Sequence, residues 1–285
     1  MNEEELLLLK LHLCGLDLKS EMQIANFLLT HESIPTKQEL WSLLELSASK
    51  KEDLMTKLAS RTLEQKLEKN LTQTKVLTIL NSQYPEQLRE SYRPPIVLFY
   101  QGDITLLERP LFGVVGTRQS THYAYEALKH LLPPVVKQKM ALVSGLAKGV
   151  DGLAQRLTLE FSGKTVAVIG NGLDISYPNE NKALQSQIGR SGLILSEYAL
   201  GSPPLRYHFP MRNRIIAGLI KVLLVVEARH HSGSLITANL ALQENREVLA
   251  LPGRINDPLS QGCNELIAAG AKIVLTANDI LEEMF

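Results

Sequence analysis

Apolar residues recur at every third or fourth position through the first 70 residues of the chain. This helical spacing predicts short helices that each bury one face, over Glu3–Leu13, Glu21–Leu29, Lys37–Leu46 and Glu52–Leu58. Two of them carry a start signal, because Ser or Thr followed three residues later by Glu satisfies two free N–H groups at a helix N-terminus. Thr36 precedes Glu39, and Ser49 precedes Glu52, in this way. Residues 1–70 are therefore expected to form a small helical domain, and they show no site chemistry.

The pattern changes after a charged stretch at Thr62–Thr74. Val76–Leu80 is a predicted strand, and Pro94-Pro95 lead into the apolar, β-branched and aromatic run Ile96–Tyr100. Proline fixes the backbone at an angle compatible with extended structure, which favours a strand after this pair. Residues 71–104 are expected to form a junction that leads into a sheet.

From Leu111 onward, short runs of Val, Ile and Leu alternate with helical patterns. Continuously apolar runs predict strands buried on both faces, and strand–helix alternation predicts right-handed crossovers between parallel strands. The predicted strands are Phe112–Val115, Ala141–Val143, Thr165–Ile169, Leu193–Leu195, Val222–Val226, Val248–Ala250 and Ile273–Leu275. Residues 105–285 are expected to form an extended, Rossmann-like, doubly wound α/β domain with a mainly parallel sheet. Ligands bind such sheets beyond the carboxyl ends of the strands, so the residues after each strand are the first candidates for a site.

Charge is balanced over the whole chain but not along it. The total of 30 Lys and Arg against 30 Asp and Glu gives a net charge of zero. Residues 1–104 carry 12 basic and 15 acidic side chains, residues 105–254 carry 17 and 10, and residues 255–285 carry 1 and 5. A bulk polycation that binds any nucleic acid or anionic membrane is excluded, whereas a local basic face in the sheet domain is favoured.

Cysteine usage and hydropathy indicate the compartment. Cys14 and Cys263 are the only cysteines and lie near opposite ends of the chain, so neither a disulfide framework nor a cysteine-based zinc site is indicated. The opening segment Met1–Glu5 is acidic where a secretory signal is basic, and no apolar run approaches the roughly 18 residues of a membrane span. A cytoplasmic protein without membrane association is expected.

Glycine-rich segments follow the first two predicted parallel strands, at Gly113–Thr121 and Ser144–Gly152. Glycine lets a ligand approach the backbone, N–H groups at a helix start attract anions, and a guanidinium such as that of Arg118 suits phosphate. Both segments predict a phosphate-binding loop. The alternative interpretation is a tight turn that carries a surface arginine. Ser144 is not favoured as a nucleophile, because it lies in no Gly-x-Ser-x-Gly elbow and has no base nearby in sequence.

Two nucleotide-binding motifs are incomplete. Gly170 and Gly172 supply the first two glycines of a dinucleotide fingerprint, but Ile175 stands where the third belongs. Gly163-Lys164-Thr165 resembles the end of a Walker A loop, yet it precedes a strand and does not open a helix. We therefore expect neither NAD nor ATP, and no cofactor is assigned.

Cations and aromatic rings gather in a proline-rich loop that leads into a helix predicted over Asn213–Ile220. The residues concerned are Arg206, Tyr207, His208, Phe209, Arg212 and Arg214. Aromatic faces stack on unpaired bases for about 1–3 kcal/mol each while arginines hold the phosphates, which is the usual arrangement for single-strand recognition. The alternative is a solvated loop whose rings cover the sheet, with the last two arginines serving structural carboxylates.

The segment after the strand Val222–Val226 contains the adjacent histidines His230 and His231. Adjacent residues do not face one metal in regular structure, and no carboxylate or cysteine completes a set at familiar spacing, so no metal site is expected. The next three residues, Ser232-Gly233-Ser234, are expected to cap a helix and to offer N–H and hydroxyl donors toward the same anion site.

A series of short sequence motifs extends along the chain from Tyr84 to Ala271. They are Tyr84-Pro85, Pro94–Tyr100, Val115–Arg118, Ser144–Asp151, Gly172–Asp174, Tyr177-Pro178, Ser196–Tyr198, Phe209–Arg214, Val226–Ala228, Ser232–Thr237, Leu251–Gly253 and Gly270-Ala271. Through these motifs the chain resembles the DNA-processing protein A (DprA, also called Smf) family, bacterial proteins that handle incoming single-stranded DNA during natural transformation.

The resemblance implies an extended Rossmann domain that binds single-stranded DNA without catalysis, forms a homodimer and helps load the RecA recombinase. It also implies that the N-terminal helices form a sterile-alpha-motif-like domain. By the same resemblance Arg118 contacts backbone phosphate, Arg206 and Phe209 supply a cation and a stacking ring, and loops at Gly145 and Gly172 shape the floor. The expected strand-binding residues are Gly116, Thr117, Arg118, Ser144, Gly145, Lys148, Gly172, Arg206, Phe209, Arg212, Asn213 and Ser232. The dimer interface is expected around Leu266, Ile267 and Ile273, where an apolar stripe ends the chain.

The chain departs from the family pattern at Ala124, where relatives often have Gly, and at Gln155, where they often have His. The second departure weakens any catalytic role at that position. An alternative function is a Rossmann-type enzyme that hydrolyses the N-glycosidic bond of nucleoside monophosphates with a Pro-Gly-Gly-x-Gly-Thr loop and a glutamate. The nearest match, Pro252-Gly253-Arg254-Ile255, lacks the second glycine. A protein adaptor that uses the acidic termini is a third alternative.

Overall fold

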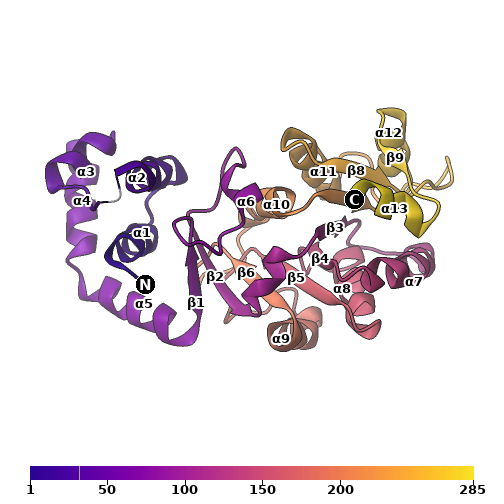
Figure 1. Ribbon diagram of the computed structural model, residues 1–285, viewed down its shortest axis with the longest axis horizontal. Coiled ribbons are helices and arrows are strands. Elements are labelled where there is room, and N and C mark those ends of the chain that lie inside the picture. Colours follow the sequence, from indigo (N-terminus) through magenta and orange to yellow (C-terminus); the bar gives the residue numbers. More distant parts are fainter. Residues whose placement is uncertain (32) are drawn as a thin grey trace.

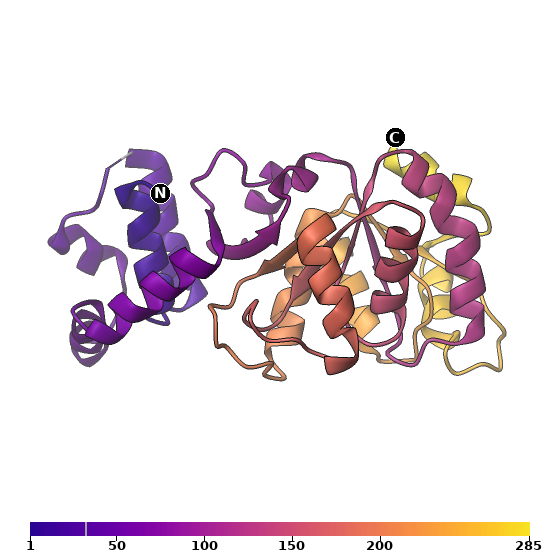
Figure 2. The ribbon, with the colours of Figure 1, turned by 90° about the horizontal axis from the view of Figure 1, so that it is seen from below.

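The computed structural model describes residues 1–31 and 33–285, which divide into a helical part and a part built around one sheet (Figure 1). Figure 2 shows the helical part at one end of an elongated molecule. Its helices are α1 (Glu3–Leu13), α2 (Leu18–His31), α3 (Lys37–Leu43), α4 (Ala48–Leu58) and α5 (Arg61–Gln73). Their shared core is aliphatic and includes Leu8, Leu9, Leu11, Ile24 and Leu28, each at most 2% exposed.

Side-chain caps fix four of these helix starts, at Asn2, Thr36, Ser47 and Ser60. Thr36 caps α3 through the predicted capping box, since its Oγ1 accepts from the Glu39 N–H while the Glu39 carboxylate accepts from the Thr36 N–H. The start predicted at Ser49 is wrong, because α4 begins at Ala48 and Ser47 is its N-cap. Ser49 and Glu52 therefore both lie inside the helix.

The charged stretch Thr62–Thr74, which the apolar pattern did not predict to be helical, forms most of α5. Leu63 and Asn70 are buried on its inner face. The helix packs against α1 and against the first strand of the sheet, so it joins the two parts of the molecule.

A nine-stranded sheet, in the order β1-β2-β6-β5-β4-β3-β7-β8-β9, forms the second part. Its strands are β1 (Lys75–Thr78), β2 (Val97–Gly102), β3 (Leu111–Val115), β4 (Ala141–Ser144), β5 (Lys164–Ile169), β6 (Leu193–Ser196), β7 (Val222–Val225), β8 (Glu247–Ala250) and β9 (Lys272–Ile273). Strands β3 to β9 pair in parallel, which confirms the predicted doubly wound, mainly parallel sheet. The strand predicted at Ile273–Leu275 is shifted and shortened.

The first two strands run antiparallel at the edge nearest to the helical part (Figure 1). Val76 of β1 pairs with Phe99 of β2, and Phe99 pairs in turn with Ser196 of β6. The range 71–104 thus supplies two strands to the same sheet as well as the short elements α6 (Glu86–Arg89) and η1 (Ile104–Glu108).

Helices cover both faces of the sheet (Figure 1). They are α7 (His122–Lys137), α8 (Val150–Glu160), α9 (Lys182–Ser191), α10 (His208–Leu219), α11 (Gly233–Gln243), α12 (Gln261–Ala268) and α13 (Ala277–Met284), with a short turn η2 (Asn179–Asn181) before α9. Alternate residues of β3 pack on opposite faces, Phe112 and Val114 in the core with α7 and α8, Leu111 and Val115 in the core with α10.

The strand order changes direction between β3 and β7. From β3 the chain proceeds through β4, β5 and β6 toward one edge, and α10 then carries it back to β7 on the other side of β3. The carboxyl ends of these two central strands form the topological switch point, where open α/β sheets bind ligands.

Several helix boundaries differ from those predicted from the sequence. Helix α10 begins at His208, five residues before the predicted Asn213, so much of the Arg/aromatic segment is helical. Helix α7 is expected around Tyr123–Leu132, after the first glycine-rich segment, but it continues through Pro133 and Pro134 to Lys137, and Val135 still packs in the core. Within residues 1–31 and 33–285, every helix is too short or too polar to cross a membrane.

Candidate functional site

A cavity of about 710 Å³ opens at the switch point. Three segments form most of its lining: the turn after β3 (residues 115–118), the segment after β7 (residues 229–237) and the start of α10 with the residues before it (residues 206–213). The topology therefore brings together strand ends that are more than 100 residues apart in the sequence.

Three arginines on this cavity, Arg118, Arg206 and Arg229, are exposed to solvent. The guanidinium of Arg118 lies 5.7 Å from the centre of the Phe209 ring, and that ring lies 5.4 Å from the ring of Tyr177. Sequence reasoning missed Tyr177 and Arg229 as site residues, although both follow strand ends and so satisfy the rule that singled out the others. The cavity thus combines solvent-accessible cations with two aromatic rings.

The turn after β3 is held in place by the start of α8 and by the backbone at Glu227. A Cβ on Gly116 would lie 2.6 Å from Val150 Cγ2, so a side chain there would collide with the start of α8. The Thr117 N–H donates to the Glu227 carbonyl at 2.7 Å, and the Thr117 carbonyl accepts from the Val150 N–H at 3.0 Å. These bonds fix the backbone on both sides, and Arg118 projects from a rigid support.

Helix α11 begins at the opposite wall. Ser232 is its N-cap residue, but the Ser232 side chain makes no capping hydrogen bond, contrary to the expectation that it caps the helix. Its Oγ is buried without a hydrogen-bond partner and belongs to the lining of the cavity. Gly233 and Ser234, in the first turn, also line the cavity, so free N–H groups and a free hydroxyl are available to an anion.

A second, smaller cavity of about 140 Å³ adjoins the first and shares Arg118, Tyr177, Phe209 and Arg212 with it. Gly145, Lys148 and Asn171 are among the residues that complete its lining. The loops after β4 and β5 supply these residues, so the segments after five strands, β3 to β7, contribute to the two cavities together.

Arg212 and Asn213 lie inside helix α10, and Arg212 is only 5% exposed. Its guanidinium donates to the carbonyls of Gly145 and Val168, and its Nε donates to Asn213 Oδ1 at 3.0 Å. Burial lowers the pKa of Arg212 to about 10, although the nearby carboxylate of Asp151 favours the charged form. Arg212 therefore forms part of the cavity floor, bound to the protein itself.

Asp151 is the buried acid beside Arg212. Burial raises the pKa of this carboxyl group. The charge of Arg212 and a hydrogen bond from the Gly145 N–H at 3.1 Å partly offset this increase. The aspartate and the arginine together tie the Gly145 loop to α10.

Three expected strand-binding residues make contacts of other kinds. Ser144 is fully buried and its Oγ donates to the Val114 carbonyl at 2.6 Å. Lys148 is exposed and pairs with Glu180 at 2.9 Å. Gly172 lines neither cavity; a Cβ there would lie 2.6 Å from the Ala199 carbonyl, so this glycine allows two loops to pack closely.

The glutamate at the end of β7 and the Pro-Gly segment after β8 are both held by protein contacts. The Glu227 carboxylate is 2% exposed and accepts from the N–H and the hydroxyl of Thr121, the N-cap of α7. The Pro252 carbonyl accepts from Tyr123 Oη at 2.7 Å, and a Cβ on Gly253 would lie 2.0 Å from Ser260 Oγ. Glu227 therefore holds the N-cap residue of α7 and is closed to solvent.

The residues expected at a dimer interface lie on α12 and β9. Leu266 and Ile267 are half-buried, whereas Ile273 is 43% exposed on the edge strand β9 and the neighbouring Leu275 is 70% exposed. No group of three or more His, Cys, Asp or Glu side chains within residues 1–31 and 33–285 is placed to hold a metal ion. His230, one of the adjacent histidines, pairs with Glu265 at 2.8 Å.

Known proteins share both the sequence and the fold. Residues 75–285 match the family model described as DNA recombination-mediator protein A. DNA processing protein DprA of Streptococcus pneumoniae is 47% identical over 206 residues, 72% of this chain and 73% of that protein. The Bacillus subtilis protein of the same name is 42% identical over 209 residues, 73% of this chain and 70% of that protein.

Two solved structures agree with this relationship. The X-ray structure of DprA from Streptococcus pneumoniae superposes with a TM-score of 0.91 and 37% identity, over 99% of this chain and 98% of that one. DNA processing protein A from Helicobacter pylori, whose structure was described for its single-stranded DNA binding mode, gives a TM-score of 0.67 and 33% identity, over 74% and 94% of the two chains. By its sequence and its fold, this chain belongs to the DNA recombination-mediator protein A family, the family of the DNA processing proteins DprA and Smf.

Proposed function

We propose that this chain binds single-stranded DNA in the cavity at the switch point, protects incoming strands during natural transformation and helps to load the RecA recombinase onto them. The observation that carries the proposal is the group of exposed arginines, Arg118, Arg206 and Arg229, around the rings of Phe209 and Tyr177. Its relatives named DNA processing protein, and the single-stranded DNA binding mode described for the Helicobacter pylori protein, support it.

In this proposal the strand backbone follows the larger cavity. The three exposed arginines hold phosphates, and the start of α11 with the unpartnered Ser232 hydroxyl receives another phosphate oxygen. One base enters the smaller cavity and stacks against Phe209 beside Tyr177. Stacking and phosphate contacts read no base edges, so binding tolerates different sequences.

The test is fluorescence anisotropy with single- and double-stranded oligonucleotides of several lengths and sequences. We expect the single strand to bind more tightly, and Arg118→Glu and Arg206→Glu to weaken that binding by about tenfold or more each, because each removes a charge-assisted hydrogen bond. Arg156→Glu is the control, since this exposed arginine of α8 lines neither cavity. Wild-type affinity in both cavity variants would overturn the assignment of the site.

The remaining steps of the proposal need their own measurements. The chain acts without catalysis, so a nucleotide panel should release no ribose; release would favour the N-glycosidic hydrolase. The homodimer uses α12 and β9, and Ile273→Asp should shift the mass measured by sedimentation toward the monomer. The RecA role predicts that the protein accelerates RecA filament formation on coated single strands, which a strand-exchange assay reports.

A further inference from the structure

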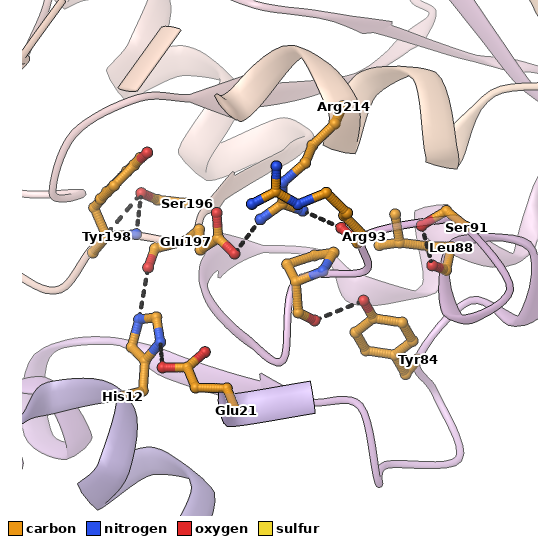
Figure 3. Close-up of polar contacts among 11 residues, drawn as sticks. His12, Glu21, Tyr84, Leu88, Ser91, Arg93, Ser196, Glu197, Tyr198 and Arg214 are labelled. Carbon is orange, nitrogen blue, oxygen red and sulfur yellow. Dashed lines mark hydrogen bonds and ion pairs between the residues drawn. The ribbon is translucent and has the colours of Figure 1, made fainter. Parts of the chain in front are cut away.

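A buried polar network joins the helical part to the end of β6 (Figure 3). On α1, His12 Nδ1 lies 2.9 Å from Glu21 Oε1, and His12 Nε2 lies 2.8 Å from the Glu197 carbonyl oxygen. The side chains of His12 and Glu21 are 15% and 4% exposed. Both partners of the ring are acceptors, so only the protonated imidazole donates to both at once.

The network continues from β6 to the cavity. The Glu197 carboxylate pairs with Arg214 of α10, which also donates to the Arg93 carbonyl at 2.6 Å (Figure 3). The ring of the next residue, Tyr198, stacks on the ring of His208, with 3.7 Å between ring centres. His208 begins α10 and directly precedes Phe209, so the segment that His12 holds also supports the stacking ring.

Helix α5 holds the same loop at a second point. Asn70, only 1% exposed, accepts a hydrogen bond from the Leu200 N–H at 2.9 Å. Lys69 lies 3.3 Å from Asp174, whose other carboxylate oxygen accepts from the Gly201 N–H at 2.8 Å. Residues 197–205 thus connect the points of contact with the helical part to Arg206.

We propose that His12 and Asn70 are positioning residues for strand binding, through which the helical part holds residues 197–205 so that Arg206 and Phe209 face the cavity. This inference rests on the proposed binding of single-stranded DNA. Residues 197–205 contain no helix or strand of their own. When these residues are already ordered before the strand binds, binding does not have to offset the conformational entropy lost on ordering them, and the affinity is higher.

The protonation of His12 provides a readout that separates positioning from packing. Burial opposes the charge of this ring, but the attraction and hydrogen bond of Glu21 on α2, together with those of Glu197 after β6, raise its pKa to about 9. The ring also faces Phe99 of β2, which carries no charge. When His12 loses its proton, one of its two bonds is lost, so strand affinity should fall as the pH rises through about 9.

The test measures oligo(dT) affinity of the full chain by anisotropy, with melting temperatures for every variant. We expect His12→Ala and Asn70→Ala to weaken binding by about three- to tenfold each, the worth of one or two buried hydrogen bonds. Hydrogen exchange in residues 197–205 should rise in both variants. In His12→Gln, whose amide still donates to the Glu197 carbonyl, most affinity should return and the loss of affinity through about pH 9 should disappear. His31→Ala is the control, an exposed histidine of α2 in the same part of the molecule.

The outcomes separate this inference from the function on which it rests. If the wild type binds no single-stranded DNA, the proposed function fails. If the wild type binds but its affinity is constant through about pH 9, the positioning role of His12 is wrong and the proposed function still stands. This measurement uses the wild type alone, so it does not depend on whether any variant folds. Unchanged affinity in folded His12→Ala and Asn70→Ala would overturn the inference in the same way.

Discussion

Gly145 packs so closely against the guanidinium of Arg212 that a side chain at position 145 should destabilise the protein. In Gly145→Ala, the added methyl group would lie 2.6 Å from the Cζ, Nη1 and Nη2 atoms of Arg212. The guanidinium would have to leave a buried position in which it donates to two carbonyl oxygens. Overpacking of this kind costs about 1–3 kcal/mol, and losing hydrogen bonds from a charged group costs about 1.5–3 kcal/mol. Together they predict that the free energy of unfolding falls by about 2.5–6 kcal/mol.

Urea denaturation of the full chain, followed by circular dichroism, measures this loss. Gly233→Ala is the control, because a Cβ on Gly233 meets nothing within 4 Å. It should change stability by no more than about 1 kcal/mol, in the stabilising direction. A double variant with Arg212→Met tests the cause, since the cost of the added methyl group should shrink when the guanidinium is absent. A loss below about 1 kcal/mol in Gly145→Ala, or the same loss in both backgrounds, would refute the reasoning.

Two further substitutions test neighbouring contacts. Phe209→Ala should weaken oligonucleotide binding by about 1–3 kcal/mol because it removes the stacking ring, and anisotropy measures the change; affinity equal to that of the wild type would remove Phe209 from the site. Ser144→Ala should lower the free energy of unfolding by about 1 kcal/mol, because it removes the hydrogen bond to the Val114 carbonyl, and leave affinity unchanged. A loss of affinity in the stable variant would show that Ser144 reaches the strand.

Much of the sheet could be predicted because its central strands are buried on both faces, and such strands consist largely of Val, Ile and Leu. Helix α5 escaped prediction because its buried side is narrow, with Leu63 and Asn70 among charged neighbours. The antiparallel pairing of β2 with β6 also escaped, since the direction of a strand depends on partners far away in the sequence. For the same reason nothing in the sequence of α1 marked His12, whose partner Glu197 lies 185 residues away.

The candidate site was predictable to the level of loops and not to the level of side chains. Carboxyl ends of parallel strands meet at one edge, so the segments of Arg118, Arg206 and Ser232 had to come together. The burial of each side chain depends on the helix register of α10, which starts earlier than the sequence indicated. Arg212 consequently lies under the Gly145 loop, although it is only six positions from the exposed Arg206.

The distribution of charge leads to a prediction about salt. Residues 105–254 carry 17 basic and 10 acidic side chains, an excess of seven, yet Arg212 and Arg214 are buried and bound to carbonyl or carboxylate oxygens. Three exposed arginines remain on the cavity. If each neutralises one phosphate of a single strand, the logarithm of the binding constant falls with the logarithm of salt concentration with a slope of about −2. Participation of all seven excess charges would give about −5, so a salt titration of the wild type distinguishes a local site from a diffuse basic face. Arg229→Ala should then reduce the slope by about 0.7, and an unchanged slope would remove Arg229 from the strand path.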